Sequence, residues 1–341
     1  MSTPVVDIHT HLYPSVYLDA LRARTEAPKL VPSPEGDLFV IFPGEPGRIM
    51  GAEYSDVALK LEFMDRSGID QSVVSLGNPW LDPFDADQTL QLARDLNDEF
   101  AALRDDTDAR IVGMGVLPNG DVSAAVEVAG EIAERDSLYG VVVGTRICGL
   151  RLDDDGLDPF WSVLEKTGLP MFIHPHYGLG MEDLLGYNHA LPVGLAFPFE
   201  TTAAVSRFIF GGVYERFPDL KIVASHGGGT LPFLAGRLDA AWQSDPIAQE
   251  RLPVVPSERL GKLFLDALSY HPRAMRATAD LVGERQMAFG TDHPFSVSDP
   301  AANLQGIGEA FEGSARDAVL HSSATEYFAL PSLNRTNGNG R

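Results

Sequence analysis

The feature that most constrains the fold is a regular alternation of apolar, β-branched segments with helical patterns along the chain. The segments predicted as strands are 5–9, 72–76, 111–117, 139–143, 170–174, 220–226, 263–266 and 286–291. The helical patterns between them cover 56–67, 86–104, 122–136, 158–167, 201–216, 230–243, 271–282 and 299–311. Strict alternation of strand and helix indicates a parallel sheet in an α/β protein.

Eight strand–helix units predict a (β/α)8 barrel, the TIM-barrel fold. Such a barrel takes about 250 residues, which leaves about 90 of the 341 residues for insertions. Residues 13–54, rich in Pro and Gly, and residues 177–200 are expected to be long loops on the active-site face of the barrel. We expect one barrel domain over residues 1–330, with a small insertion at about 13–54 and an unordered polar tail at 331–341.

The composition fits a globular protein without disulfide bonds. A hydrophobic content of 44% can fill a complete core, and no apolar run approaches the roughly 20 residues of a membrane span. The N-terminus leads directly into strand-like sequence and has no secretory signal pattern, so a cytoplasmic location is expected. The single cysteine, Cys148, rules out a disulfide framework and a cysteine-rich zinc site.

Acidic residues outnumber basic ones by 48 to 26, which gives a formal net charge of −22. This charge repels nucleic acids and anionic membranes, so neither is expected as a partner. A small anionic substrate would depend on arginines placed locally in the binding site.

Two histidines, His9 and His11, lie at the end of the first predicted strand. Residues two apart in a strand share a face, so both imidazoles point the same way. Paired neutral imidazoles suit a borderline metal such as zinc. An isolated HxH spacing also arises by chance or from histidines that are hydrogen-bonded in a core, so a metal site needs further ligands.

Such ligands occur at other predicted strand ends. His174 ends the fifth strand and is followed by His176, His226 ends the sixth, and Asp292 follows the eighth. Because the carboxyl ends of barrel strands form one face, these side chains are expected to meet the HxH pair. Each has a structural alternative: His174 can cap a strand, His226 can belong to a glycine-rich turn, and Asp292 can cap the next helix. His176 fits either a rim residue or a substrate contact.

With this set of strand-end histidines and an aspartate, the sequence resembles the amidohydrolase superfamily, and within it the aminocarboxymuconate semialdehyde decarboxylase family. The stretches most similar to its isoorotate (uracil-5-carboxylate) decarboxylase branch are TPVVDIHTHLYPSVYL, FMDRSGIDQSVVSLGNPW, HPHYGLG, GGTLPFLAGR and FGTDHPF. The resemblance covers residues 4–330. It implies a metal-dependent decarboxylase without an organic cofactor, on a (β/α)8 barrel of the amidohydrolase type.

The resemblance implies a metal centre and an acid–base residue. By position, zinc would be bound by His9, His11, His174 and Asp292. His226 would act in acid–base chemistry beside the metal.

The resemblance also implies residues that bind the substrate. Arg48 falls where the family has an arginine for the substrate carboxylate, and Arg237 where family dimers offer an arginine across the subunit interface. A homodimer or higher homo-oligomer is therefore expected. Asn78 and Trp80 fall at the pocket edge, and His176 is assigned as a further substrate contact. Taken alone, each arginine also fits a surface charge, and Asn78 fits a turn.

Differences from the family sequences limit which substrate and how many metal ions are expected. The muconate enzymes usually carry Trp, Trp and Tyr where this chain has His176, Val193 and His293, so the pocket is predicted to take another substrate. Gly227 stands where isoorotate decarboxylase has Ser. Binuclear relatives bridge two metals with a carboxylated lysine on the fourth strand, but YGVVVGT contains none. One divalent ion is expected, zinc or else manganese.

The predicted reaction is the non-oxidative decarboxylation of a planar ring carboxylate, uracil-5-carboxylate-like or hydroxybenzoate-like. A carboxylate beside a carbonyl or phenolic oxygen can chelate the metal, which stabilises the negative charge that develops as carbon dioxide leaves. Asp292, or a metal-bound water worked by His226, would protonate the ring carbon. Alternatives are a metal-dependent hydrolase of a lactone or cyclic amide, a decarboxylase of aminocarboxymuconate semialdehyde, and a non-catalytic metal-binding protein.

Overall fold

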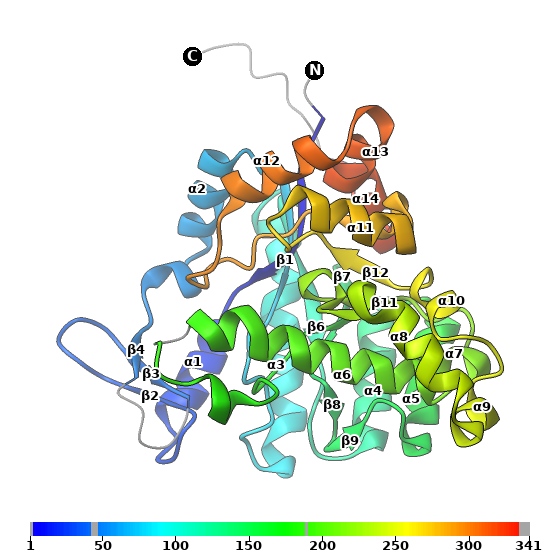
Figure 1. Ribbon diagram of the computed structural model, residues 1–341. Coiled ribbons are helices and arrows are strands. Elements are labelled where there is room, and N and C mark those ends of the chain that lie inside the picture. The colour runs from blue at the N-terminus through cyan, green and yellow to red at the C-terminus, as the bar shows by residue number, and fades with distance from the viewer. Residues whose placement is uncertain (1–2, 42–46, 188–189, 334–341) are drawn as a thin grey trace.

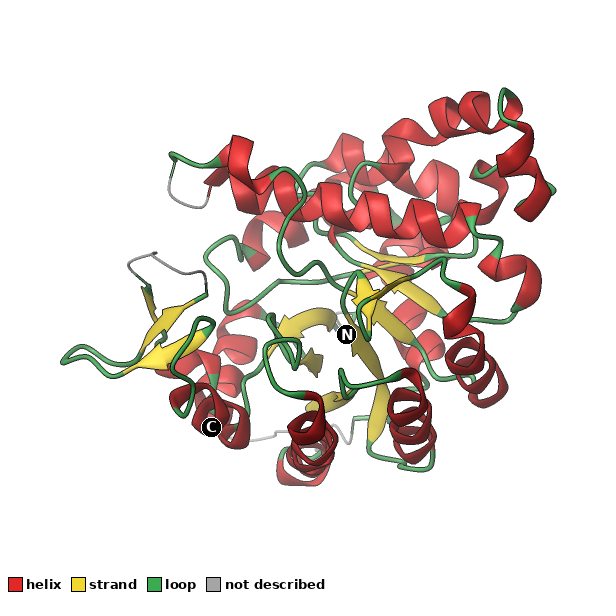
Figure 2. Ribbon diagram, turned by 90° about the horizontal axis from the view of Figure 1, so that it is seen from below, coloured by secondary structure: helices red, strands yellow, loops and turns green. Residues whose placement is uncertain are grey.

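The computed structural model describes residues 3–41, 47–187 and 190–333, and the predicted eight-stranded parallel sheet is present (Figure 1). In spatial order its strands are β1 (Val6–His11), β5 (Gln71–Ser75), β6 (Ile111–Val116), β7 (Leu138–Val143), β10 (Met171–Ile173), β11 (Ile222–Ala224), β12 (Phe264–Asp266) and β13 (Met287–Ala288). Hydrogen bonds join the first strand to the segment after the last: Ile8 N donates to Phe289 O at 3.1 Å, and Thr10 pairs with His293. Helices lie outside the strands in Figure 2, so the (β/α)8 barrel is confirmed.

Several strands are shorter than the sequence pattern predicts. The predicted strand 170–174 is reduced to β10 and 220–226 to β11. His174 and His226 therefore lie just beyond the hydrogen-bonded strands, in the loops at their carboxyl ends. In a barrel these loops carry the active site.

The outer helices follow the predicted patterns with one exception. They are α2 (Val57–Ser67), α3 (Ala86–Asp106), α4 (Val122–Ala133), α5 (Asp158–Thr167), α6 (Phe197–Phe210), α8 (Leu231–Gln243), α11 (Pro272–Val282) and α12 (Pro300–Ala310). The sequence reading missed the short helices α9 (Pro246–Arg251), α10 (Ser257–Leu260), α13 (Gly313–Asp317) and α14 (Ser323–Phe328). Within the described ranges, no helix combines the length and apolarity needed to cross a membrane.

The exception is the predicted helix 201–216, which is divided. The helix α6 starts earlier, at Phe197, and ends before Gly211; α7 (Val213–Arg216) is a separate turn. Gly212 has φ +65°, and a Cβ there would lie 2.2 Å from the carbonyl oxygen of Arg251. A left-handed glycine ends a helix readily, because it has no Cβ to clash.

The prediction of a long loop at 13–54 was wrong for part of that range. It contains α1 (Ser15–Arg22) and an antiparallel sheet of β2 (Lys29–Val31), β3 (Leu38–Val40) and β4 (Arg48–Ile49), which lies beside α1 in Figure 1. Strands of two or three residues are too short to show a period in the sequence. The insertion packs next to the end of β1, where Tyr13 N donates to Tyr54 O at 2.8 Å.

The segment 177–200 is also more ordered than a loop. It contains a 3-10 helix at Met181–Leu184, a π-helical turn at Pro192–Ala196 and the first residues of α6. The Glu200 carboxylate accepts hydrogen bonds from the backbone N–H groups of His176, Tyr177 and Gly178 at 3.1, 3.0 and 2.6 Å. Glu200 thereby fixes the loop after β10. Most of the predicted tail, residues 334–341, lies outside the described residues.

Candidate active site

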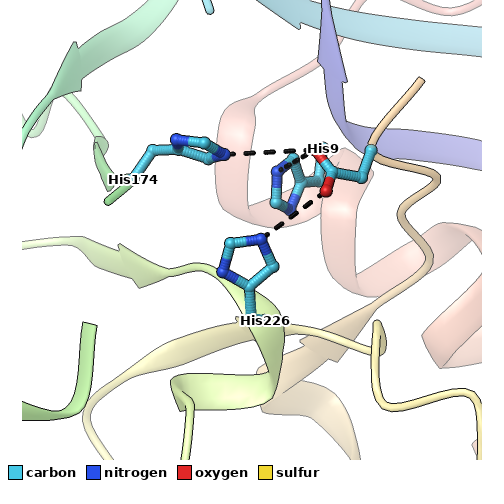
Figure 3. Close-up of side chains that lie close together, drawn as sticks. His9, His174 and His226 are labelled. Carbon is cyan, nitrogen blue, oxygen red and sulfur yellow. Dashed lines mark ion pairs between the residues drawn. The ribbon is translucent and has the colours of Figure 1, made fainter. Parts of the chain in front are cut away.

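Four of the predicted residues converge at the carboxyl ends of the strands (Figure 3). His9, His174, His226 and Asp292 each offer a ligand atom, and these atoms all lie within 4.8 Å of one another. They come from β1, the loop after β10, the turn after β11 and the loop after β13. The predicted convergence of distant strand ends is therefore present.

The Asp292 carboxylate is the centre of this cluster. Its Oδ1 lies 3.2 Å from Nε2 of His9 and 4.0 Å from Nε2 of His174, and its Oδ2 lies 3.7 Å from Nε2 of His226. Burial would raise the pKa of Asp292, but the nearby charge of His9 and hydrogen bonds from the surrounding histidines hold it well below its usual range. Asp292 is therefore an ionised carboxylate, aimed at three imidazoles.

Unpaired imidazole nitrogens show that the cluster fits a metal ion. Among the described residues, Nε2 of His174 is buried without a hydrogen-bond partner, and Nε2 of His9 is buried and approaches only the Asp292 carboxylate, without good hydrogen-bond geometry. A buried polar atom left without a partner costs free energy, so such atoms are rare in folded proteins. Several neutral imidazoles with a carboxylate form a normal donor set for a divalent transition metal.

His11, the remaining predicted ligand, lies beside the same carboxylate. Its Nε2 is 3.2 Å from Asp292 Oδ1, and the Ser75 hydroxyl lies 3.1 Å from its Nδ1. The rings of His11 and His174 have centroids 4.8 Å apart. Both histidines of the HxH pair thus face the cluster, as the strand spacing predicts. In addition, the structure brings His226 within ligand distance.

The backbone at two of these residues is strained. His226 has φ +56° and Asp292 has φ +57°, a region that residues with a Cβ rarely adopt. Such conformations cost of order 1–3 kcal/mol each and are found where the surroundings enforce them, often at functional sites. Asp292 does not cap the following helix, since the side chain of Asp299 accepts the Ala302 N–H at the start of α12. The capping alternative for Asp292 was therefore wrong.

Asp266, at the end of β12, is a site residue that the sequence reading missed. Its Oδ2 lies 2.6 Å from Nδ1 of His9 and accepts the His226 N–H at 2.7 Å, while its Oδ1 accepts the Gly227 N–H at 2.8 Å. Burial would raise the pKa of Asp266, but these hydrogen bonds and the charge of His9 lower it. Asp266 lies at the end of the predicted strand 263–266, just as the candidate metal ligands lie at strand ends. This position was the one signal in the sequence that could have identified it.

The two carboxylates make the centre strongly attractive to a cation. Burial acts to lower the pKa of His9, but Asp292 and Asp266 outweigh it and raise that pKa to about 10. By contrast, burial lowers the pKa of His11 to about 4 and that of His174 well below its usual value. Without a metal, a proton on His9 offsets the negative charge of Asp292 and Asp266. A bound metal ion would take the place of this proton.

We expect Asp266→Asn to lower the affinity for a divalent metal by about 10- to 100-fold, because removal of an outer hydrogen-bond partner of a metal-binding histidine has effects of that size. The affinity should be measured by chelator competition. Asp239→Asn is the matched control, since Asp239 accepts the Ser257 N–H at 2.9 Å between α8 and α10, away from the cluster. Equal metal affinities of Asp266→Asn and the unmodified protein would contradict the assigned role.

The predicted pocket residues Asn78 and His176 lie together with Trp80. Asn78 Nδ2 donates to the His176 carbonyl at 3.0 Å, and the Trp80 and His176 rings have centroids 3.6 Å apart. His176 is buried, with Nε2 3.2 Å from Asp82 Oδ2, and burial lowers its pKa well below the usual value. A Cβ on Gly144 would lie 1.6 Å from the His176 ring, so only glycine leaves room for this ring position.

The two predicted arginines lie on exposed elements. Arg48 is exposed in β4, and its charge acts on the buried hydroxyl of Tyr13 and on that of Tyr54 beside the end of β1. Arg237 is exposed on α8. It lies one turn after Phe233, which is 91% exposed. Within the described residues of one chain, neither arginine forms an ion pair with Asp292 of the cluster.

A parallel (β/α)8 barrel with histidines and an aspartate gathered at the carboxyl ends of its strands defines a metal-dependent barrel enzyme. The amidohydrolase family profile matches residues 6–330. The chain therefore belongs to the amidohydrolase family, as its sequence motifs predict.

Individual relatives agree with this assignment. The 2-amino-3-carboxymuconate-6-semialdehyde decarboxylase of Dictyostelium discoideum is 31% identical over 81% of this chain and 77% of its own length. Among solved structures, apo IDCase (isoorotate decarboxylase) of Metarhizium anisopliae is 32% identical, with a TM-score of 0.90 over 96% of this chain and 97% of the other. The 5-carboxyvanillate decarboxylase LigW of Sphingomonas paucimobilis is 25% identical, with a TM-score of 0.83 over 97% and 100%.

A more distant structure contains a metal. The dihydroxybenzoic acid decarboxylase of Polaromonas, solved with bound manganese and the inhibitor 2-nitroresorcinol, is 19% identical over 96% of this chain and 98% of its own, with a TM-score of 0.78. At this identity the likeness establishes a shared fold.

Proposed function

We propose that the protein is a metal-dependent, non-oxidative decarboxylase of a planar ring carboxylate. The observation that carries the proposal is the buried Asp292 carboxylate, which faces several imidazoles at the mouth of the barrel. The relatives named above are decarboxylases, in agreement with the carboxy-lyase predicted from the sequence.

We further propose one divalent ion, zinc by its preference for imidazole ligands or manganese as in the Polaromonas enzyme. His9, His11, His174 and Asp292 would hold it, with His226 beside them. β7, Leu138–Val143, carries no lysine that could bridge a second ion. When bound, the ion would polarise substrate oxygens and offset developing negative charge.

The residues of the chain supply binding and proton transfer. Arg48 would bind the substrate carboxylate through charge-assisted hydrogen bonds. Asn78 and His176 would contact the edge of the substrate ring. A proton added to the ring carbon that bears the carboxylate lets the carbon–carboxylate bond break. The bonding electron pair then returns to the ring, and carbon dioxide leaves.

The proton path runs through the two residues assigned to catalysis. Among His9, His174, His226 and Asp292, the His226 side chain is the most exposed at 14%, and its Nε2 lies 3.7 Å from Asp292 Oδ2. His226 can take up a proton from solvent and pass it to Asp292. Asp292, or a water activated by His226, would deliver it to the ring carbon.

The substrate test uses metal-loaded protein and a small panel: uracil-5-carboxylate, 2,6-dihydroxybenzoate, aminocarboxymuconate semialdehyde, a lactone and a cyclic amide. We expect trapped carbon dioxide and a decarboxylated product from a ring acid. Benzoate is the matched control, because it lacks the oxygen next to the carboxylate and should stay inert. Opening of the lactone or amide without release of carbon dioxide from any acid would replace the decarboxylase proposal with the hydrolase alternative.

We also propose a homodimer in which Arg237 completes the neighbouring pocket. The exposure of Phe233 and Arg237 one turn apart on α8 supports this proposal, since a large exposed aromatic side chain is common at subunit interfaces.

Mixing inactive Arg237→Ala chains with inactive His9→Ala chains should restore part of the activity, up to about a quarter for random pairing, because hybrid dimers contain one intact site. Arg273→Ala, on α11, is the control for loss of a surface arginine and should stay active alone. A fully active monomer in sedimentation measurements of mass would exclude the dimer.

A further inference from the structure

A lysine without exposed surface contacts residues that flank the proposed metal ligands. Lys60 of α2 is 0% exposed, and its Nζ lies 2.8 Å from Thr10 Oγ1 and 2.7 Å from His293 Nδ1. In the described part of the chain no carboxylate forms a direct ion pair with Lys60, although the charges of Asp7 and Asp292 act on it. Burial of an ammonium group without a directly paired carboxylate is costly, so its contacts need an explanation.

Both contacts of Lys60 are neighbours of proposed metal ligands. Thr10 lies between the two histidines of the HxH pair, and His293 follows Asp292 directly. Lys60 Nζ is also 3.4 Å from the His293 carbonyl oxygen, which accepts the His11 N–H at 2.7 Å and the Thr10 hydroxyl at 3.0 Å. One carbonyl thus joins β1, the loop after β13 and the helix α2.

The helix α2 holds His293 from a second side. The Phe63 ring is stacked on the His293 ring, with centroids 3.7 Å apart and an interplanar angle of 22°. Lys60 and Phe63 are three residues apart and therefore lie on the same face of the helix. Together they fix both the backbone and the ring of His293.

The residue on the other side of Asp292 is fixed as well. The buried Asp7 carboxylate accepts the Thr291 hydroxyl at 2.6 Å and the Thr291 N–H at 3.1 Å. Asp292 therefore stands between two anchored neighbours, and this arrangement accounts for its left-handed φ of +57°.

We propose that Lys60 is a positioning residue: it holds the Thr10–His293 junction so that the Asp292 carboxylate stays aimed at the imidazoles of the metal centre. The inference deepens the proposed function and rests on Asp292 as a metal ligand. It requires no contact between Lys60 and the substrate.

The first test is the affinity for zinc alone, measured by chelator competition on Lys60→Met. Methionine keeps most of the length of the side chain but removes the ammonium donors. We expect a 10- to 100-fold loss of zinc affinity, as is typical when a ligand loses its outer support. The kcat of a ring-acid substrate should fall by at least 10-fold, with less than a 3-fold change in KM.

The matched control is Asn97→Ala. Asn97 of α3 is likewise buried and fixes a barrel strand, since it donates to the Val116 carbonyl at 3.1 Å and accepts the Val116 N–H at 2.7 Å. The end of β6 carries no proposed ligand. Asn97→Ala should lower the unfolding temperature without changing zinc affinity.

If Lys60→Met fails to fold, Thr10→Val provides the second measurement. It removes the hydroxyl that Lys60 and the His293 carbonyl share, but keeps a β-branched side chain in β1. A loss of zinc affinity supports the proposal for either variant. Unchanged zinc affinity in a folded variant, with only a lower unfolding temperature, overturns it. Absence of zinc binding by the unmodified protein would instead contradict the proposed metal centre.

Discussion

Asp292→Asn is expected to reduce turnover by at least about 100-fold. A correctly positioned proton donor accelerates a reaction by about 100- to 10,000-fold, and this residue is also a proposed metal ligand. The amide keeps the size of the side chain but can neither carry the proton nor neutralise a cation. The barrel should remain folded, since the ring of strands closes through backbone hydrogen bonds. Steady-state kinetics and metal content, with circular dichroism for folding, check this prediction.

Asp299→Asn is the matched control for this substitution. Asp299 lies seven residues further along, and its carboxylate caps α12 through the Ala302 N–H at 2.9 Å. Asparagine is an equally good N-cap, so that variant should keep its activity. The role of Asp292 would be wrong if Asp292→Asn retained more than a tenth of the turnover with bound metal.

The barrel and its ligand-bearing strand ends could be predicted from the sequence because both are local patterns. An apolar run shows where a strand lies, and its last polar residue shows what reaches the carboxyl-end face. His9 and Asp292 were found in this way although they are far apart in the chain, since parallel strands bring all their carboxyl ends to one face. The strand periodicity even gave the shared direction of His9 and His11.

The supporting residues could not be predicted, because their roles depend on pairs of positions and not on local patterns. Asp266 is 257 residues away from His9, and Lys60 is 233 residues away from His293. A lysine within an amphipathic helix is normally exposed, and nothing in its neighbourhood indicates complete burial. Its direction depends on how α2 packs on the barrel, and this packing is visible only in three dimensions.

The insertion illustrates a second limit. Its strands have two or three residues, and their pairing, such as Phe39 with Arg48, is set by tertiary contacts. Arg48 was placed by resemblance alone, and the structure shows it exposed on this small sheet near Tyr13 and Tyr54. Whether the arginine reaches a substrate therefore depends on the position of the sheet and not on the barrel itself.

His226→Asn is expected to lower kcat by about 100- to 10,000-fold, because proton transfer by a correctly positioned side chain accelerates a reaction by about that factor. The effect on substrate binding should be much smaller. The position of His226 favours this separation. Its backbone N–H is held by Asp266 at 2.7 Å, so asparagine at this site should keep the turn, while its side chain is the most exposed of the four-residue cluster. The variant should also keep more metal than Asp292→Asn does.

His271→Asn serves as the matched control. His271 is exposed at the start of α11, where its side chain accepts the Arg273 N–H at 3.3 Å, a capping role that asparagine can fill. It should leave kcat unchanged. The decisive comparison is between kcat and the affinity for a product analogue in His226→Asn. If affinity falls as much as kcat, or if the metal is lost as completely as in Asp292→Asn, His226 acts as a ligand or binding residue and the proton must reach the ring carbon by another group.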